Sequence, residues 1–350
     1  MRRGLMARDE NELPQSVLAA RIEGLRAAMA RGGLDGFVCY TNLVQPSAVT
    51  YLTGFTPYWS DGLLLVPRSG APVFATALSK RVANWIASTN PVSEIVNTPK
   101  PGAALGVRLT AEGARRVGVL ELERLPGGLY DEITGAAPAL ELMDGSAAFA
   151  TLRRRIDGAE RGLIERADAL ALSALAQIDP ARVSDAGAAA GLVEKEARLK
   201  GAEEAYIAVA PDLAADRRMI RVSDPLPLAD RFALRASVAY KGSWVRRTRT
   251  FAKTGTEAVA RADAWFENLA ASFVPGQPIG AQLTTRLSAL PGAKLIGWLA
   301  ESPVGSYPLE AIASARAPER DGLPDGGFAV LTVELMLDGT PWLGAAPVFA

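Results

Sequence analysis

Histidine is absent from this chain of 350 residues, and cysteine occurs only once. Without histidine the protein has no imidazole to act as a general base, to bind a metal ion or to activate a serine or cysteine nucleophile. The single cysteine, Cys39, allows no internal disulfide and no cysteine-rich zinc site. Because Cys39 lies in an apolar segment, we expect it to be a buried core residue.

An excess of charge of either sign is also missing, since 38 lysine and arginine residues balance 38 aspartate and glutamate residues. Without a net basic field there is little to attract phosphates, so we expect no nucleic-acid partner. No apolar run reaches the length of about 20 residues that a membrane-spanning helix needs, and residues 1–13 lack the apolar core of a signal peptide. We therefore expect a cytoplasmic protein with no membrane partner.

The length of the chain is sufficient for two ordinary domains, and its pattern changes near residue 150. Apolar positions recur at helical spacing over 17–31, and a double glycine ends that run. Short apolar stretches typical of strands follow at 36–40, 62–66, 72–75 and 116–120. This alternation predicts an α/β domain over residues 1–150.

The second half of the sequence combines longer helical stretches with strand patterns. The helical stretches span 152–178, 184–199 and 257–273. The strand patterns span 205–209, 232–240, 248–252 and 328–335. We therefore predict a second domain over 151–350 and an α+β class for the whole protein.

A series of short motifs stands in a particular order along the chain. They are Arg21-Ile22, Gly33-Leu34-Asp35-Gly36, Tyr51-Leu52-Thr53-Gly54-Phe55, Leu152-Arg153, Arg155-Ile156, Tyr240-Lys241-Gly242, Thr248-Arg249-Thr250-Phe251, Glu301-Ser302-Pro303 and Thr332-Val333-Glu334. Together they resemble the creatinase, prolidase and aminopeptidase P family. The resemblance implies a creatinase-like N-terminal domain, a C-terminal domain of the pita-bread fold, and a homodimer.

Members of that family normally hold two divalent metal ions with two aspartates, one histidine and two glutamates. The two aspartate positions hold Arg246 and Arg235 here. The histidine position falls near Ala293, the first glutamate position holds Glu334, and the second falls near Gly344. Two aspartates replaced by arginines change the local formal charge by about four units, which opposes a divalent cation. We therefore expect no metal ion and no other cofactor.

The arginines allow two interpretations. In the first, Arg235 and Arg246 pair with Glu334 and Asp230, because buried arginine needs anionic partners, and the fold is retained without a ligand. In the second, the pocket persists and binds an anion, since a guanidinium suits carboxylate or phosphate recognition. Residues alternate between faces along a strand, so Arg246 is expected to point inward while Arg247 points to the opposite side.

Our preferred hypothesis is a metal-independent small-molecule enzyme of hydrolase or lyase type. It would bind a carboxylate-bearing, amino-acid-like substrate through Arg235, Arg246 and Arg217. With no histidine, acid–base work would be left to Glu334, Glu301 or Tyr240. An arginine beside a glutamate favours the ionised carboxylate, which weakens it as a base unless desolvation opposes this effect.

The aromatic residues Tyr58 and Trp59 follow Phe55 in a segment that contains proline. The resemblance implies that this loop reaches toward the partner's pocket in the dimer, where the two rings would form an aromatic wall for the substrate. Packing of the two rings on their own domain is the competing interpretation.

The alternative function belongs to another class. Relatives of this fold are known that bind histones or other partners without cleaving them. The chain would then be a catalytically inactive pseudoenzyme that acts as a binding or scaffold protein. An enzyme is expected to have an open cavity with convergent polar groups, whereas a scaffold is expected to have a filled pocket.

Overall fold

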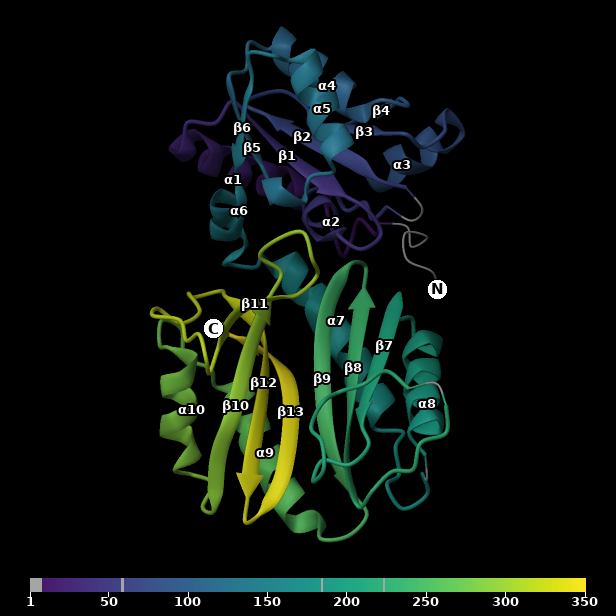
Figure 1. Cartoon of the computed structure of the whole chain (residues 1–350), viewed down its shortest axis with the longest axis vertical. Helices are drawn as coiled ribbons and strands as arrows, with labels where there is room; N and C mark the ends of the chain where they lie inside the picture. Colours follow the sequence, from purple (N-terminus) through teal and green to yellow (C-terminus); the bar gives the residue numbers. More distant parts are fainter. Residues whose placement is uncertain (1–7, 58–59, 184, 223) are drawn as a thin grey trace. The chain divides into compact units, whose positions relative to one another are not determined.

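The computed structural model describes residues 8–57, 60–183, 185–222 and 224–350. Contacts divide the chain into two compact units, which are described separately (Figure 1). The N-terminal unit extends to Arg154 and also includes Pro303–Glu310. The C-terminal unit comprises Arg155–Ser302 and Ala311–Ala350. The sequence pattern placed the division at residue 150 and did not predict that residues 303–310 join the N-terminal unit.

A six-stranded mixed sheet, in the order β4-β3-β2-β1-β5-β6, forms the centre of the N-terminal unit. Its strands are β1 (Gly36–Thr41), β2 (Gly62–Pro67), β3 (Val73–Thr76), β4 (Glu94–Asn97), β5 (Arg116–Val119) and β6 (Glu141–Asp144). The pairs β1–β2 and β2–β3 are antiparallel, whereas β1–β5, β5–β6 and β3–β4 are parallel. The predicted α/β character of this half is confirmed.

Helices and apolar side chains cover both faces of this sheet. The helices are α1 (Gln15–Gly32), α2 (Ser47–Thr53), α3 (Ala83–Thr89), α4 (Pro101–Ala111), α5 (Gly127–Ala136) and α6 (Ser146–Arg153), and two 3-10 turns lie at Lys80–Val82 and Leu122–Arg124. Along β1, Phe37 and Cys39 join one apolar cluster, whereas Val38 joins the other, as strand alternation requires. Cys39 is fully buried, and burial raises the pKa of its thiol, so the prediction of a core cysteine is confirmed.

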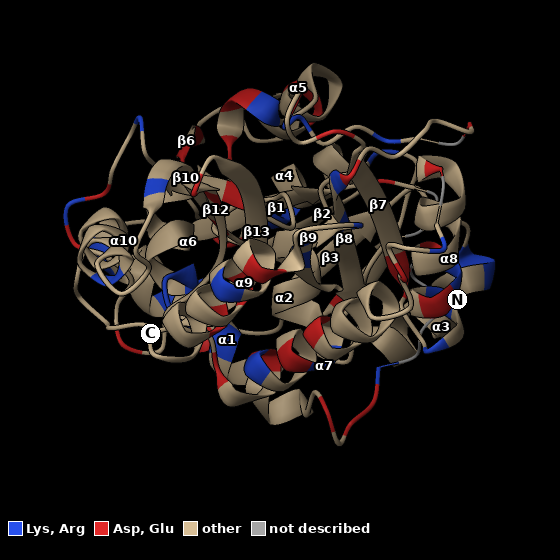
Figure 2. Cartoon of the chain, turned by 90° about the horizontal axis from the view of Figure 1, so that it is seen from below, with Lys and Arg blue, Asp and Glu red and all other residues tan. Residues whose placement is uncertain are grey.

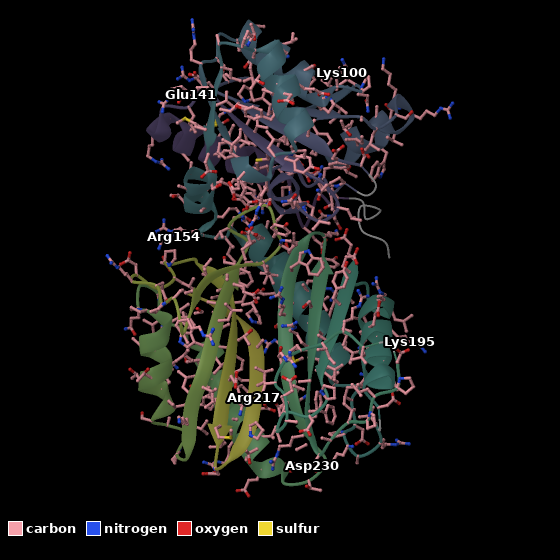
Figure 3. All side chains as sticks on the ribbon, viewed as in Figure 1. Lys100, Glu141, Arg154, Lys195, Arg217 and Asp230 are labelled. Carbon is pink, nitrogen blue, oxygen red and sulfur yellow. The ribbon has the colours of Figure 1, made fainter. Side chains whose placement is uncertain are left out.

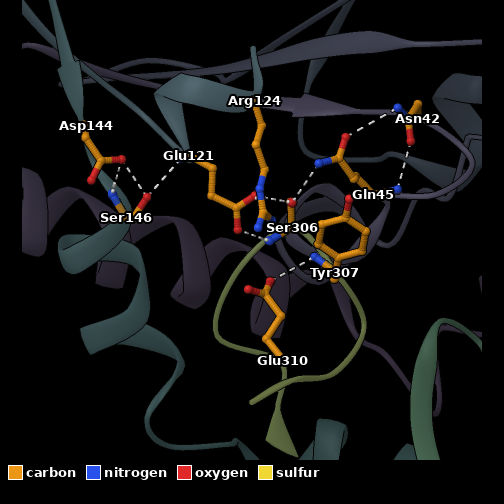
Figure 4. Close-up of polar contacts among 9 residues, drawn as sticks. All are labelled: Asn42, Gln45, Glu121, Arg124, Asp144, Ser146, Ser306, Tyr307 and Glu310. Atoms are coloured by element: carbon orange, nitrogen blue, oxygen red, sulfur yellow. Dashed lines mark hydrogen bonds and ion pairs between the residues drawn. The ribbon is translucent and has the colours of Figure 1, made fainter. Parts of the chain in front are cut away.

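A polar cluster holds Pro303–Glu310 within the N-terminal unit (Figure 4). The carboxylate of Glu121 accepts hydrogen bonds from the Ser306 hydroxyl at 2.5 Å, the Ser306 amide at 3.1 Å and Arg124 at 2.9 Å. Gln45 donates to the same Ser306 hydroxyl oxygen at 3.3 Å. Glu121 has a left-handed backbone with φ of 51°, which costs on the order of 1 kcal/mol for a residue with a side chain. The bonds to Ser306 and Arg124 offset that cost.

A seven-stranded sheet in the order β11-β10-β12-β13-β9-β8-β7 forms the C-terminal unit. Its strands are β7 (Glu204–Ala210), β8 (Arg231–Tyr240), β9 (Ser243–Ala252), β10 (Ala293–Ser302), β11 (Glu310–Ser314), β12 (Phe328–Leu337) and β13 (Thr340–Phe349). The neighbours β7–β8, β8–β9, β10–β12 and β12–β13 pair over most of their length. The join between β13 and β9 has a single registered pair, Ala345 and Thr248.

Helices cover one face of this sheet, and in Figure 1 they lie behind it or beside its outer strands. They are α7 (Gly158–Leu175), α8 (Ala186–Leu199), α9 (Thr256–Ala271) and α10 (Ile279–Leu287). On β12, Val333 and Leu335 are buried with Phe266 of α9 in the core beneath the sheet, whereas the alternate residues Thr332 and Glu334 point the other way. We call that second side the helix-free face. The α+β class is confirmed.

The predicted helix over 152–178 is wrong, because two helices occupy that region. Helix α6 ends at Arg153 in the N-terminal unit, and α7 begins at Gly158 in the C-terminal unit. Asp157 is extended, and its carboxylate accepts a hydrogen bond from the Glu160 amide at 2.8 Å, which caps α7. Among the described residues, no helix has the length and apolar composition required to cross a membrane.

Glu310 makes the attachment of Pro303–Glu310 sensitive to pH. Burial raises the pKa of Glu310 above its ordinary value of 4.5, with a smaller contribution from the negative charge of Glu121, while the Tyr307 amide and Arg124 oppose the shift. A raised folded-state pKa stabilises the fold at low pH, and that stability is lost as the pH rises from about 4.5 through the folded-state value.

We predict that Glu310→Gln, which stays neutral, avoids this loss. The difference in unfolding temperature between the variant and the wild type should grow as the pH rises from 4.5 and then level off. Thermal unfolding at a series of pH values tests this. A difference that is constant over that range would contradict it.

Candidate functional site

The pairing of β8 with β9 places Arg235 and Arg246 on the helix-free face. Ser237 lies opposite Arg246, and Arg235 lies opposite Thr248. Arg247, one residue further along β9, points to the covered face, as alternation predicts. There it bonds Asp168 of α7 at 2.5 and 2.9 Å and Glu267 of α9 at 2.8 Å. Figure 2 shows acidic and basic residues together along α7 and α9.

Two glutamates of the helix-free face, Glu301 and Glu334, are each bonded to an arginine. Glu301 at the end of β10 forms an ion pair with Arg246, and its side chain is only 9% exposed. Glu334 of β12 accepts a hydrogen bond from Arg217 at 2.5 Å, and its side chain is 26% exposed. Arg217 is in the segment that joins β7 to β8 and lies over the sheet in Figure 3. Both carboxylates are therefore held by guanidinium groups.

This pattern of ion pairs differs from the one expected from the sequence. Arg246 bonds Glu301 rather than Glu334, because Glu334 is taken by Arg217. Asp230 has no part in the site. It precedes the first residue of β8, at the lower end of the sheet in Figure 3, and accepts a hydrogen bond from Thr254 at 2.8 Å.

Arg235 has neither an ion pair nor a hydrogen bond to any residue that the structure describes. Its side chain is partly buried, and burial lowers the pKa of its guanidinium. The positive charge of Arg246 lowers that pKa further, and Glu301 opposes both effects. An arginine remains charged in proteins even so. The cluster formed by Arg217, Arg235, Arg246, Glu301 and Glu334 therefore carries one uncompensated positive charge.

A cavity of about 480 Å³ opens beside Arg217 and Glu334 and is also lined by residues 213–218. Leu213 packs with Ala233 and Leu343, which holds the joining segment against the helix-free face. Apolar contacts of Leu213 therefore hold one end of the site, and the ion pairs Arg217–Glu334 and Arg246–Glu301 hold its centre. The charged residues that line the cavity are Asp216, Arg217, Arg218 and Glu334, and Arg217 and Glu334 connect it to the cluster.

One predicted residue, Tyr240, does not join this cluster. Tyr240 ends β8 with its ring under Arg166 of α7, at 5.9 Å, and so lies on the covered side rather than beside Arg235. This placement removes our reason to regard Tyr240 as a proton-transfer group. Tyr58 and Trp59 lie outside the described residues.

The residues present do not fit a dinuclear metal centre. Guanidinium groups stand at both positions where the resemblance implies an aspartate, and Glu334 and the nearby Glu301 each already accept from an arginine. Gly344, near which the second glutamate position falls, faces the helices, because a Cβ there would overlap the ring of Trp342. The next residue of β13, Ala345, faces the helix-free side and has no group that could bind a metal ion. Among the described residues, no group of three or more histidine, cysteine, aspartate or glutamate side chains is placed to hold a metal ion.

The sequence analysis missed an aromatic pair on the helix-free face. The rings of Tyr206 on β7 and Trp244 on β9 are stacked, with centroids 5.7 Å apart and planes 13° apart. Strand alternation from Arg246 was a usable signal for Trp244, which is two residues earlier on the same strand. Tyr206 had no such signal, because its position depends on the register between β7 and β8.

Comparison with known proteins agrees with this architecture. Residues 21–155 match the Creatinase/Prolidase N-terminal domain. This match, together with the solved structures described next, confirms the resemblance to creatinase, prolidase and aminopeptidase P proteins. A search of curated proteins finds no sequence match.

Solved structures extend the likeness to the whole chain. An Xaa-Pro dipeptidase from Bacillus anthracis has a TM-score of 0.69 at 18% identity, and 95% of each chain is covered. An X-Pro aminopeptidase from Thermotoga maritima has a TM-score of 0.69 at 14% identity, covering 92% of this chain and 95% of the other. The N-terminal domain of a FACT complex subunit from chickpea (Cicer arietinum) has a TM-score of 0.64 at 13% identity, covering 95% and 94%. At these identities the likeness establishes the fold alone.

We predict that Arg247→Met destabilises the protein by roughly 3 kcal/mol, because it leaves the carboxylate of Asp168 without its bidentate partner at a largely buried position. Chemical denaturation measures the change. The matched control is Arg198→Met, since the Arg198–Glu194 pair on α8 is 36% and 40% exposed; its loss should cost less than about 1 kcal/mol. Equal effects of the two substitutions would contradict the prediction.

Proposed function

We propose that this chain is a metal-independent enzyme of hydrolase or lyase type that binds a small, carboxylate-bearing, amino-acid-like substrate on the helix-free face. The observation that carries the proposal is the guanidinium of Arg235, which has no ion pair or hydrogen bond among the described residues and is partly buried. A charged group in such a position is stabilised by an anion, and a carboxylate matches its forked geometry.

In this proposal the Arg217–Glu334 ion pair is the part of the site that changes when the substrate binds. Arg217 bonds Glu334, and both residues line the cavity. A substrate carboxylate that takes over Arg217 would release Glu334 from its partner. Glu334 then holds or moves the proton, while Arg235 and Arg246 bind the anion. Glu301, which is more buried and paired with Arg246, positions that arginine.

The second candidate is a catalytically inactive binding or scaffold protein. The observation in its favour is that both glutamates of the arginine cluster, Glu301 and Glu334, are bonded to arginines, so neither is free to act as a base. The likeness to a FACT complex subunit is compatible with this candidate. Both candidates keep the prediction of a homodimer in which Tyr58 and Trp59 approach the partner's site. Both also keep the prediction of a cytoplasmic location.

Thermal unfolding in the presence of propionate tests the binding site. Propionamide has a similar shape but no charge, and ionic strength is held constant with chloride. Propionate should raise the unfolding temperature and propionamide should not, because a ligand at one hundred times its Kd adds about 2.7 kcal/mol of stability. Arg235→Met should weaken propionate binding at least tenfold.

Arg249→Met is the matched control, because it removes the same charge from the covered side of β9, where Arg249 lies 3.7 Å from Asp263. It should leave propionate binding unchanged. Loss of binding in both variants, or no stabilisation of the wild type, would contradict the proposed site.

Turnover separates the two candidates. A panel of N-acyl amino acids is incubated with the wild type, Glu334→Gln and Arg235→Met, and loss of substrate is followed by mass spectrometry. The enzyme proposal predicts turnover that falls at least a hundredfold in Glu334→Gln, consistent with loss of a proton-transfer group. Carboxylate binding without turnover of any member supports the inactive binding protein instead.

A further inference from the structure

The register of the C-terminal sheet brings the stacked aromatic pair to the arginine cluster. Tyr206 lies directly opposite Ser237, and Ser237 lies directly opposite Arg246. Side chains that face each other across paired strands share one face of a sheet. Trp244 is on the same face because it is two residues from Arg246. Tyr206, Trp244 and Arg246 therefore line one continuous surface within the C-terminal unit.

Arg235 is close to the same pair. It is paired with Ala208, two residues beyond Tyr206, so Tyr206 and Arg235 are diagonal neighbours on adjacent strands. Such neighbours are roughly 7–8 Å apart at the backbone, within reach of long side chains. A molecule whose anionic group binds Arg235 would thus place the rest of its body over the aromatic pair.

The tyrosine of this pair is unusually accessible for an aromatic residue within a strand. Tyr206 is 41% exposed, although Trp244 packs against its ring. The guanidinium of Arg221 lies 5.4 Å from the centroid of the same ring. This distance is longer than that of a close guanidinium–ring contact elsewhere in the protein, in which Arg153 lies 3.8 Å from the centroid of the Tyr51 ring. Arg221 is itself exposed, so it covers Tyr206 only loosely.

We propose that the site takes an aromatic carboxylate, whose planar ring packs against Tyr206 and Trp244 while its carboxylate binds Arg235. This inference rests on the proposed function and names its substrate class. Offset stacking of a flat ring on exposed aromatic side chains is favourable and selects planar over puckered groups. Arg221 would shift and close over the outer face of the bound ring as a cation–π partner.

Isothermal titration with three carboxylates tests the inference. Benzoate is planar, cyclohexanecarboxylate has the same charge and a similar size but a puckered ring, and propionate has no ring. We expect benzoate to bind at least tenfold more tightly than cyclohexanecarboxylate. Equal affinity for the two cyclic acids would overturn the aromatic preference.

Variants of Tyr206 locate that preference. Tyr206→Leu should weaken benzoate binding at least fivefold and leave propionate unchanged, whereas Tyr206→Phe should keep the wild-type affinity for both. Tyr130→Leu is the matched control, since Tyr130 of α5 is 42% exposed and lies in the N-terminal unit. If Tyr206→Leu weakens propionate and benzoate equally, or leaves benzoate unchanged, the inference is wrong.

The failure of the inference and that of the proposed function give different results. If Arg235 is not an anion site, the wild type binds neither propionate nor benzoate. If Arg235 binds carboxylates but the aromatic pair does not contribute, propionate and benzoate bind with similar affinity, and Arg235→Met abolishes both. Thermal unfolding of each variant confirms that it is folded before titration.

Discussion

An imbalance of charge on one face of the C-terminal sheet is the constraint on which the candidate site depends. Arg217, Arg235 and Arg246 face Glu301 and Glu334, and the two glutamates are each taken by one arginine. The third guanidinium is left partly buried with no anion among the described residues. Removing a charge from water is costly unless a partner is supplied. A cluster of this kind favours an incoming anion and disfavours an incoming cation.

Strand β9 connects this site to the helices α7 and α9 that cover the other face of the sheet. Its alternate residues serve two purposes, because Trp244 and Arg246 face the site while Arg247 is bonded to α7 and α9 on the covered side. The buried ion pair of Arg247 with Asp168 holds the strand against its helices. The side chains on the opposite face are therefore presented from a rigid element, which is what a preorganised binding site requires.

Much of the fold was predictable from the sequence, because it depends on local patterns. The β1 strand is a short continuous apolar run that is buried on both faces, and the motif order along the chain carried the resemblance to the prolidase family. The break between α6 and α7 was missed because the cap at Asp157 interrupts an otherwise continuous helical pattern. The attachment of Ser306 to Glu121 was also missed, since it joins residues 185 positions apart.

The candidate site was predictable only in part, for a similar reason. Alternation along one strand correctly separated Arg246 from Arg247, which is local information. The partner of each arginine depends on strand register and on where the segment after β7 returns, and so Glu301 rather than Glu334 bonds Arg246. Tyr240 was misplaced because its interaction with Arg166 of α7 is a tertiary contact. Tyr206 entered the site only through the register of β7 with β8.

Titration of Mn²⁺ into chelator-treated protein, followed by calorimetry, tests most directly the claim that the arginine cluster disfavours a cation on the helix-free face. The charge arrangement predicts no saturable binding of the metal at micromolar concentrations, with or without Glu301 and Glu334. Saturable uptake of Mn²⁺ that Glu334→Gln and Glu301→Gln both abolish would contradict the account, because it would show that these carboxylates leave their arginines to bind a metal ion.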